Sequence, residues 1–207
     1  IAGMGSDLCE SYVGAIVSGI SLGVSWLAVN GGANFSVLVF PIIIAALGII
    51  SSIVSIMFVR AKEWENPSKA LNIATYVATG AEIVGSLVMS FIVFNNIMPF
   101  FAILSGLIVG VLIGKIAEYY TSEDYAHVKE IANQSLTGHA TNIISGFSIG
   151  MQSTGLTILL LAAGICASYL FFGMYGISLG AIGMLSTAGI TVSVDAYGPI
   201  ADNAGGI

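Results

Sequence analysis

The sequence predicts an all-α protein, a polytopic bundle of about six transmembrane helices. Two observations support this fold class. Of the 207 residues, 57% are hydrophobic and only 8% are charged, whereas an average soluble domain carries about 25% charged residues. The apolar residues also form continuous stretches long enough to cross a bilayer, which takes about 20 residues each. We therefore expect residues 1–207 to be part of one transmembrane helical domain.

The apolar stretches follow one another with polar interruptions between them. The first is uncharged after Glu10, the second carries no charge, and the third has one acid, Glu82, near its centre. Asn66-Pro67 stops any helix before the third stretch, and the polar residues 121–134 are expected to form a loop after the fourth. The predicted spans are approximately residues 2–29, 35–59, 71–94, 100–120, 135–172 and 177–207.

All the Lys and Arg residues lie in or beside the interruptions after the second and fourth spans. In a chain of six spans, these two loops share one side of the membrane with both termini. Because loops rich in Lys and Arg stay in the cytoplasm, the sequence predicts an integral membrane protein with both ends facing the cytoplasm. The cations concerned are Arg60, Lys62, Lys69, Lys115 and Lys129.

Glycines recur at four-residue spacing in several predicted spans. This spacing is typical of membrane helices whose backbones approach closely, because small residues allow tight packing where lipid supplies no hydrophobic drive. The sequence therefore predicts a tightly packed bundle. The sets are Gly19/Gly23, Gly106/Gly110/Gly114, Gly146/Gly150 and Gly176/Gly180.

Other functions are disfavoured by the composition. Five Lys and Arg residues cannot form the basic surface that nucleic acid requires, and no glycine-rich phosphate-binding loop follows a strand. Cys9 and Cys166 show no metal-ligand or disulfide spacing. We expect both to be buried as small hydrophobic residues.

Two acids near the start of the chain form a candidate cation site. Asp7, Glu10 and Ser11 stand at positions i, i+3 and i+4, so a helix places their oxygen atoms on one face, beside Gly14. Such a group suits a cation, although acids in the first turns of a helix also serve as partners of its dipole. Glu82 has two readings as well, either a neutral or hydrogen-bonded acid or part of an ion path.

The last predicted span carries a second acidic pair. Asp195 and Asp202 are seven residues apart, so a helix places them on one face about 10 Å apart. Gly198 and Pro199 between them are expected to loosen the backbone. Oxygen ligands of this kind suit Mg²⁺, which shares one or two carboxylates with water and phosphate oxygens.

Several stretches resemble the membrane-integral inorganic pyrophosphatases, which pump H⁺ or Na⁺. They occur in the family's order across the whole chain: AGMGSDL and ESY at the start, EYYTS at 118–122, GHATNII at 138–144, MYG at 174–176, AIGMLS at 181–186, and DAYGPIADNAGG at 195–206. The resemblance implies a homodimeric pump that hydrolyses pyrophosphate with Mg²⁺ on the cytoplasmic side and couples this reaction to ion export. It also implies that this chain is an internal piece of a larger pump.

The resemblance assigns roles to five residues. Asp202 matches a family aspartate at the magnesium pyrophosphate site, with Asp195 as its companion, while Asp7, Glu10 and Ser11 match the ion gate. Sodium-pumping members carry the gate glutamate three residues after the aspartate, where this sequence has Glu10, and plant-type proton pumps carry it at the position of Gly14. The resemblance thus favours Na⁺ as the transported ion and leaves H⁺ co-transport open.

The resemblance also implies what this chain lacks. The family's aspartate-rich hydrolytic segments have no match here, so no catalytic residue is assigned and the isolated chain is expected to be inactive. The position that decides activation by K⁺ has no match either. One alternative stays open at this point, a secondary transporter or channel subunit whose intramembrane carboxylates bind cations without hydrolysis.

Overall fold

The computed structural model describes residues 2–30, 32, 34–60 and 67–206, and within these ranges every regular element is a helix. The fold class predicted from the sequence is therefore confirmed. The elements are α1 (Ala2–Asn30), α2 (Ser36–Arg60), α3 (Pro67–Phe94), α4 (Met98–Thr121), α5 (Ala126–Gln134), α6 (His139–Ser186) and α7 (Ala188–Gly205).

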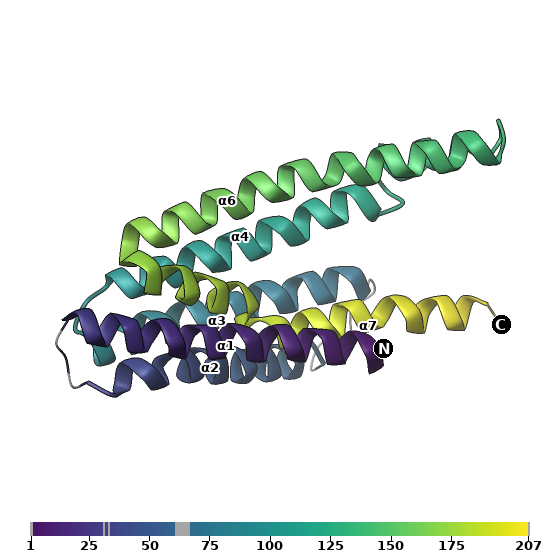
Figure 1. The fold of residues 1–207 in the computed structure, drawn as a ribbon. Coiled ribbons are helices and arrows are strands. Elements are labelled where there is room, and N and C mark those ends of the chain that lie inside the picture. The colour runs from purple at the N-terminus through teal and green to yellow at the C-terminus, as the bar shows by residue number, and fades with distance from the viewer. Residues whose placement is uncertain (1, 31, 33, 61–66, 207) are drawn as a thin grey trace.

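The long helices run side by side in alternating directions (Figure 1). The N- and C-terminal ends lie at the same end of the bundle, together with the connection from α4 through α5 to α6. The turns that join α1 to α2 and α3 to α4 lie at the opposite end. This is the arrangement expected from the alternation of charged and uncharged loops. The charged loop at 61–66 lies outside the described residues.

Helix α6 reverses direction inside its bounds. Phe172 and Gly173 leave the helical conformation, and Gly173 has a φ of 62°, a value that glycine adopts without steric cost. The chain therefore folds back, and residues 174–186 return along the bundle toward α7 (Figure 1). In the described part of the chain, five helical stretches are long and apolar enough to cross a membrane. The fifth stretch, His139–Gly205, contains this reversal, so it can cross twice. The structure therefore agrees with the predicted count of about six crossings.

Three boundaries differ from the sequence prediction. The polar stretch 121–134, expected to be a loop, contains the short helix α5, in which no residue is buried. The fifth span begins at His139 rather than Ser135, after Gly138 with a φ of 137°. The last span is interrupted at Thr187, and α7 then continues through Pro199 to Gly205. Gly198 and Pro199, which were expected to loosen the backbone, lie within this continuous helix.

The returning segment 174–186 lies at the centre of the bundle. A Cβ atom added to Gly106 or Gly183 would clash with backbone across the α4–α6 contact, and one added to Gly48 of α2 would clash with the backbone of Ser186. On the α1 side, Gly19 faces Ile182 and Gly23 faces Tyr175. The core around this segment consists of Val37, Phe40, Ile44, Ala102, Ile103, Leu107, Tyr175, Leu179 and Ile182.

The glycine prediction is correct for some positions and wrong for others. Gly19, Gly23, Gly106, Gly110, Gly176 and Gly180 lie at close helix contacts. A Cβ added to Gly114, Gly146 or Gly150 meets nothing within 4 Å. The four-residue spacing alone does not distinguish these two groups of glycines. Whether a glycine lies at a helix contact depends on which neighbouring helix approaches it, and the spacing does not show this.

Tyr175 donates a hydrogen bond to a backbone carbonyl of α2 that has no partner within the helix. Pro41 lies inside this helix and has no N–H, so the carbonyl of Val37 four residues earlier loses its helical donor. The buried hydroxyl of Tyr175 donates to this carbonyl at 2.7 Å. Since an unpaired backbone group is costly in the membrane interior, this hydrogen bond ties the returning segment of α6 to α2.

We expect Tyr175→Phe to lower the free energy of unfolding by about 1 to 3 kcal/mol, because it leaves the Val37 carbonyl buried and unpaired. Thermal unfolding of the full-length protein in detergent would measure this loss. Pro41→Ala supplies the matched control, since an alanine N–H can pair with Val37. In that background Tyr175→Phe should cost clearly less, and an equal cost in both backgrounds would contradict the explanation.

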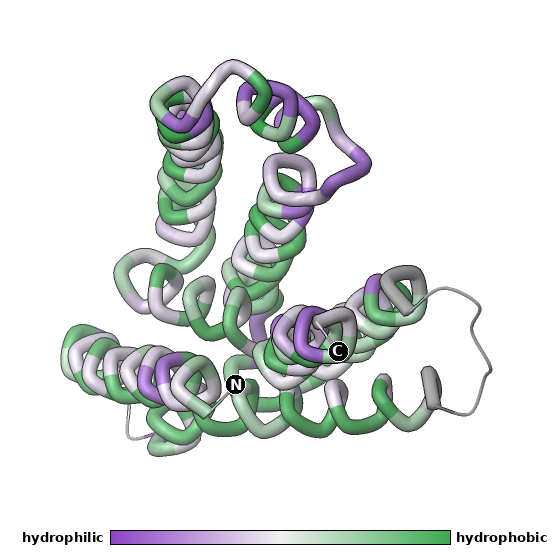
Figure 2. Tube along the Cα trace, turned by 90° about the vertical axis from the view of Figure 1, so that its right-hand side faces the viewer, coloured by the Kyte–Doolittle hydropathy of each residue, from purple (hydrophilic) through white to green (hydrophobic). Residues whose placement is uncertain are grey.

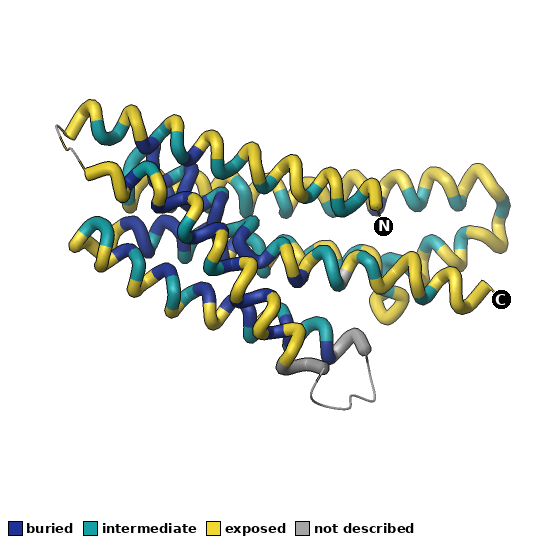
Figure 3. Tube along the Cα trace, turned by 90° about the horizontal axis from the view of Figure 1, so that it is seen from below, coloured by how far each residue is buried: buried dark blue, intermediate teal, exposed yellow. Residues whose placement is uncertain are grey.

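The outer surface of the bundle is apolar. Figure 2, which looks along the helices, shows hydrophobic residues on their outward as well as inward sides, and Figure 3 shows the buried residues concentrated in the middle of the bundle. Helices that are apolar on all sides are typical of membrane spans. Cys9 and Cys166 are both free and exposed, so the expectation that they are buried is wrong: each lies on an outward-facing helix surface.

Candidate functional site

The acids of α1 share one side of an unbroken helix. Because α1 runs from Ala2 to Asn30, Asp7, Glu10 and Ser11 stack on neighbouring turns as expected. All three are exposed. Glu10 precedes the buried Gly19 by nine residues, which is about half a turn around the helix. Glu10 therefore faces away from the helices that pack against α1 at Gly19 in the described part of the chain.

The acids of α7 lie on one continuous helix. Asp195 and Asp202 are both exposed and, seven residues apart, stand about 10 Å apart along the helix axis. Pro199 follows Asp195 by four residues, so the Asp195 carbonyl has no helical N–H donor. This part of α7 thus presents two carboxylates and one free carbonyl oxygen.

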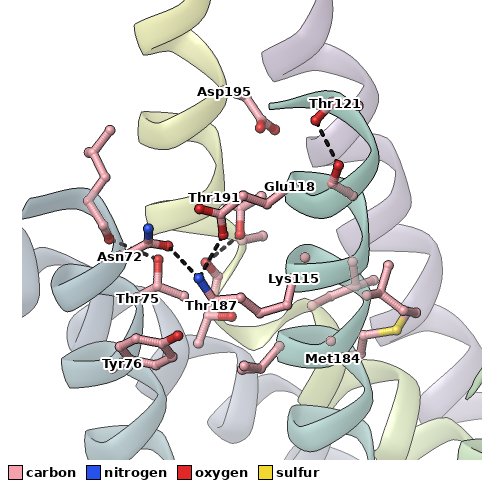
Figure 4. A pocket seen from close by; sticks show the side chains of 18 of the residues that line it. Asn72, Thr75, Tyr76, Lys115, Glu118, Thr121, Met184, Thr187, Thr191 and Asp195 are labelled. Carbon is pink, nitrogen blue, oxygen red and sulfur yellow. Dashed lines mark hydrogen bonds and ion pairs between the residues drawn. The ribbon is translucent and has the colours of Figure 1, made fainter. Parts of the chain in front are cut away.

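Asp195 borders an open pocket of about 810 Å³ between α3, α4 and α7. Figure 4 shows Asp195 and Thr191 of α7 pointing toward Glu118 of α4. Leu8, next to Asp7 on α1, also lines the pocket. The other polar residues that line it are Asn72, Thr75, Tyr76, Lys115, Thr121, Ser122, Thr157, Thr187 and Tyr197.

Lys115 is the centre of the polar contacts in this pocket. Its Nζ forms an ion pair with Glu118 Oε2 at 2.7 Å and donates to Asn72 Oδ1 at 3.4 Å. The same ammonium lies 5.8 Å from the centre of the Tyr76 ring, within the range of a cation–π contact. One cation therefore joins α3 to α4 in the pocket that Asp195 also lines.

The structure brings only some of the expected site residues together. Asp195 lies in the pocket with Glu118, whereas Asp7, Glu10, Ser11 and Asp202 do not line it. Among the described residues, no group of three or more His, Cys, Asp or Glu side chains is close enough to hold a metal ion. A Mg²⁺ ion bound here would thus have at most one or two carboxylate ligands from these residues, which fits its usual coordination.

Sequence reasoning missed the residues that α3 contributes. Asn72 and Tyr76 are far from Lys115 in sequence and belong to no acidic or resembling motif. The one available signal was Lys115 itself, since it is the one cation placed inside a predicted span rather than in a loop. A cation at a span end needs partners, but the sequence does not say which helix supplies them.

The fold and these groups define a polytopic membrane protein whose spans carry carboxylates at one end of the bundle. The chain belongs to the inorganic H⁺ pyrophosphatase family, whose model matches residues 1–207. This membership confirms the resemblance found in the sequence motifs. It also disfavours the alternative of an unrelated secondary transporter or channel subunit.

Several relatives carry the names of ion pumps. A putative K(+)-stimulated pyrophosphate-energized sodium pump of Clostridium tetani is 50% identical over 100% of this chain and 31% of its own length. A K(+)-stimulated pyrophosphate-energized sodium pump of Thermotoga maritima is 36% identical over 98% of this chain and 32% of its own length. A K(+)-insensitive pyrophosphate-energized proton pump of Chloroflexus aurantiacus is 36% identical over 99% of this chain and 30% of its own length. The chain therefore spans about a third of the length of these relatives.

Proposed function

We propose that this chain is part of an ion-translocating membrane pyrophosphatase that couples the hydrolysis of magnesium pyrophosphate to the export of Na⁺. The observation that carries the proposal is the match of the family model to residues 1–207. The relative from Clostridium tetani is named as a sodium pump, and the glutamate three residues after Asp7 favours the same ion. K⁺ is a candidate activator, since this relative's name describes it as K⁺-stimulated.

Asp7, Glu10 and Ser11 are the proposed ion gate. Their three oxygen-bearing side chains lie on adjacent turns of α1 and are exposed in this chain. Two carboxylates and a hydroxyl attract a hard monovalent cation, and a pair of like charges holds a cation or a proton between them. H⁺ co-transport at the same gate remains part of the proposal. We propose that helices of a longer polypeptide, of which this chain is one part, cover this face.

Asp202, with Asp195 as companion, is the proposed contact to magnesium pyrophosphate. Bound Mg²⁺ neutralises charge on the phosphate oxygens and orients the anhydride. The carboxylate of Asp202 would hold the ion, and the Lys115–Glu118 pair would contribute charge to the pocket that Asp195 lines. The hydrolytic residues are expected in other parts of the longer protein. Its active side is proposed to face the cytoplasm, and the pump is proposed to be a homodimer.

The proposal is tested by ion transport with the full-length protein that carries this chain, reconstituted in vesicles. Pyrophosphate added with Mg²⁺ should drive uptake of radiolabelled Na⁺, and removing either pyrophosphate or Mg²⁺ should stop it. Uptake driven by a pre-formed H⁺ gradient without pyrophosphate would instead indicate a secondary transporter.

We expect Asp202→Asn to raise the Mg²⁺ concentration that gives half-maximal hydrolysis by about tenfold or more. The amide keeps the size of the side chain but loses the negative charge, and one lost charge-assisted contact of about 1.5 kcal/mol corresponds to a tenfold change. Phosphate release measured against Mg²⁺ concentration gives the value. Asp124→Asn, which removes another exposed acid in the α4–α5 connection, should leave it unchanged. An unaltered Mg²⁺ dependence of Asp202→Asn would exclude this residue from the site.

A further inference from the structure

Glu82 lies in the interior of the bundle and does not line the pocket. It is 0% exposed, and neither carboxylate oxygen has a hydrogen-bond partner within the part of the chain that the structure describes. Among the described residues, no Lys or Arg forms an ion pair with it. A charged carboxylate in this position would lack any compensating group.

Hydroxyl groups surround Glu82, and two of them donate to backbone carbonyls. Tyr12 of α1 is the titratable side chain that faces it, and its hydroxyl donates to the Ala45 carbonyl at 2.6 Å. Ser51 of α2 faces the carboxyl without hydrogen-bond geometry. Ser86, one turn away on α3, donates to Ile83 at 3.2 Å. Hydroxyls bound in this way offer acceptor oxygens, which suit a group that itself carries a proton.

The charged groups of α4 and α7 lie at a different height along the bundle axis from Glu82. Lys115 and Glu118 of α4 and Asp195 of α7 line the pocket together with Thr75 of α3. Glu82 follows Thr75 by seven residues, which is about 10 Å along the helix, and does not line the pocket. No charge from α2, α4 or α7 therefore compensates the Glu82 carboxyl in the described part of the chain.

A metal cation does not fit this position. Na⁺ would need several oxygens converging near the carboxylate, but no polar atom of the described residues makes even a hydrogen bond to it. Glu82 also belongs to no group of three or more acidic, His or Cys side chains among the described residues. A proton needs neither space nor further ligands.

Residues with hydroxyl groups lie along α3 between the pocket and Glu82, and the hydroxyls of Thr75 and Thr79 donate to the backbone carbonyls of Leu71 and Thr75. Thr75, Thr79, Glu82, Ser86 and Ser90 follow one another at spacings of three or four residues, so they lie on one face of α3. Thr75 lines the pocket, and Thr79, Ser86 and Ser90 are buried. Polar residues continue across the contact on α2, where Ser51, Ser52 and Ser55 are also buried.

We propose that Glu82 is a proton-binding site in the membrane-embedded core, separate from the Asp7–Glu10 gate, and that protons reach it from the pocket along Thr75 and Thr79. The step moves one proton from water in the pocket to a carboxylate oxygen of Glu82 and leaves hydroxide in the pocket. The hydroxyls of Thr75 and Thr79 turn away from their backbone carbonyls, and each accepts one proton and passes one on, so only O–H bonds form and break. The site is occupied by a proton in the arrangement that the structure describes.

Infrared spectroscopy of the full-length protein tests the proposal. The C=O stretch of a protonated carboxylic acid should be present at neutral pH, shift in D₂O, and disappear in Glu82→Gln, while Glu10→Gln keeps the Glu82 contribution. If Glu82→Gln cannot be isolated in folded form, Glu82→Asp replaces it, and the band should then change in frequency. A spectrum unchanged by either substitution would overturn the proton site.

The entry path has its own test in the same measurement. Thr79→Val keeps the side-chain volume but removes the hydroxyl, so exchange of the Glu82 band in D₂O should slow several-fold. Ser90→Ala, on the other side of Glu82 along α3, is the matched control and should leave the rate unchanged. Equal rates in Thr79→Val and the unaltered protein would overturn the path. The readout requires neither hydrolysis nor Na⁺ transport, so its failure is distinguishable from failure of the proposed function.

Discussion

Glu10→Gln is expected to reduce pyrophosphate-driven Na⁺ uptake by the full-length protein at least about tenfold, since a tenfold loss needs only about 1.4 kcal/mol. The amide keeps the shape of the side chain and removes one of the two negative charges that α1 presents beside Ser11. A neutral amide attracts Na⁺ less strongly than a carboxylate does. Uptake of radiolabelled Na⁺ into vesicles measures the effect.

The control for this variant is Glu123→Gln. Glu123 is also exposed, but it lies in the connection between α4 and α5, outside the helices that cross the bundle. Its substitution should leave Na⁺ uptake unchanged. Hydrolysis of pyrophosphate should be measured for both variants, because a loss of uptake with retained hydrolysis locates the defect at the gate. Undiminished uptake by Glu10→Gln would remove Glu10 from the proposed gate.

Gly106→Ala should produce the largest loss of stability. A Cβ atom at this position would overlap the backbone carbonyl of Gly180 across the α4–α6 contact. Neither backbone can move away without separating the two helices, so the cost lies at the upper end of the range for overpacking, about 3 kcal/mol or more. A lower melting temperature of the full-length protein would show it.

Gly114→Ala is the matched control on the same helix. Gly114 lies two turns further along α4 with the same four-residue spacing, but a Cβ there meets nothing within 4 Å. The control should leave the melting temperature unchanged or raise it slightly, because alanine favours the helix more than glycine does. Equal destabilisation by the two substitutions would contradict the packing of α4 on α6.

Much of the fold could be predicted because the relevant signals are local. The lengths of the apolar stretches located α1 to α4 within a few residues, and the Lys and Arg residues placed both termini at one end of the bundle. The candidate site could be predicted only in part. The helices that carry Asp7, Glu10, Asp195 and Asp202 were correctly anticipated, but the pocket needs Asn72 and Tyr76 of α3, which no motif marks.

The sequence by itself therefore determined the spans, their alternation and the family, because hydropathy and motifs are read along the chain. The tertiary structure alone decided which helix faces meet. Tyr175 donates a hydrogen bond to a carbonyl 138 residues away, and Gly106 lies at a close helix contact whereas Gly114 does not. Glu82 is fully buried. The physical reason is that helices apolar on every side carry no pattern that separates a lipid-facing from a helix-facing surface. Steric fit and hydrogen bonding between particular helices then make the choice.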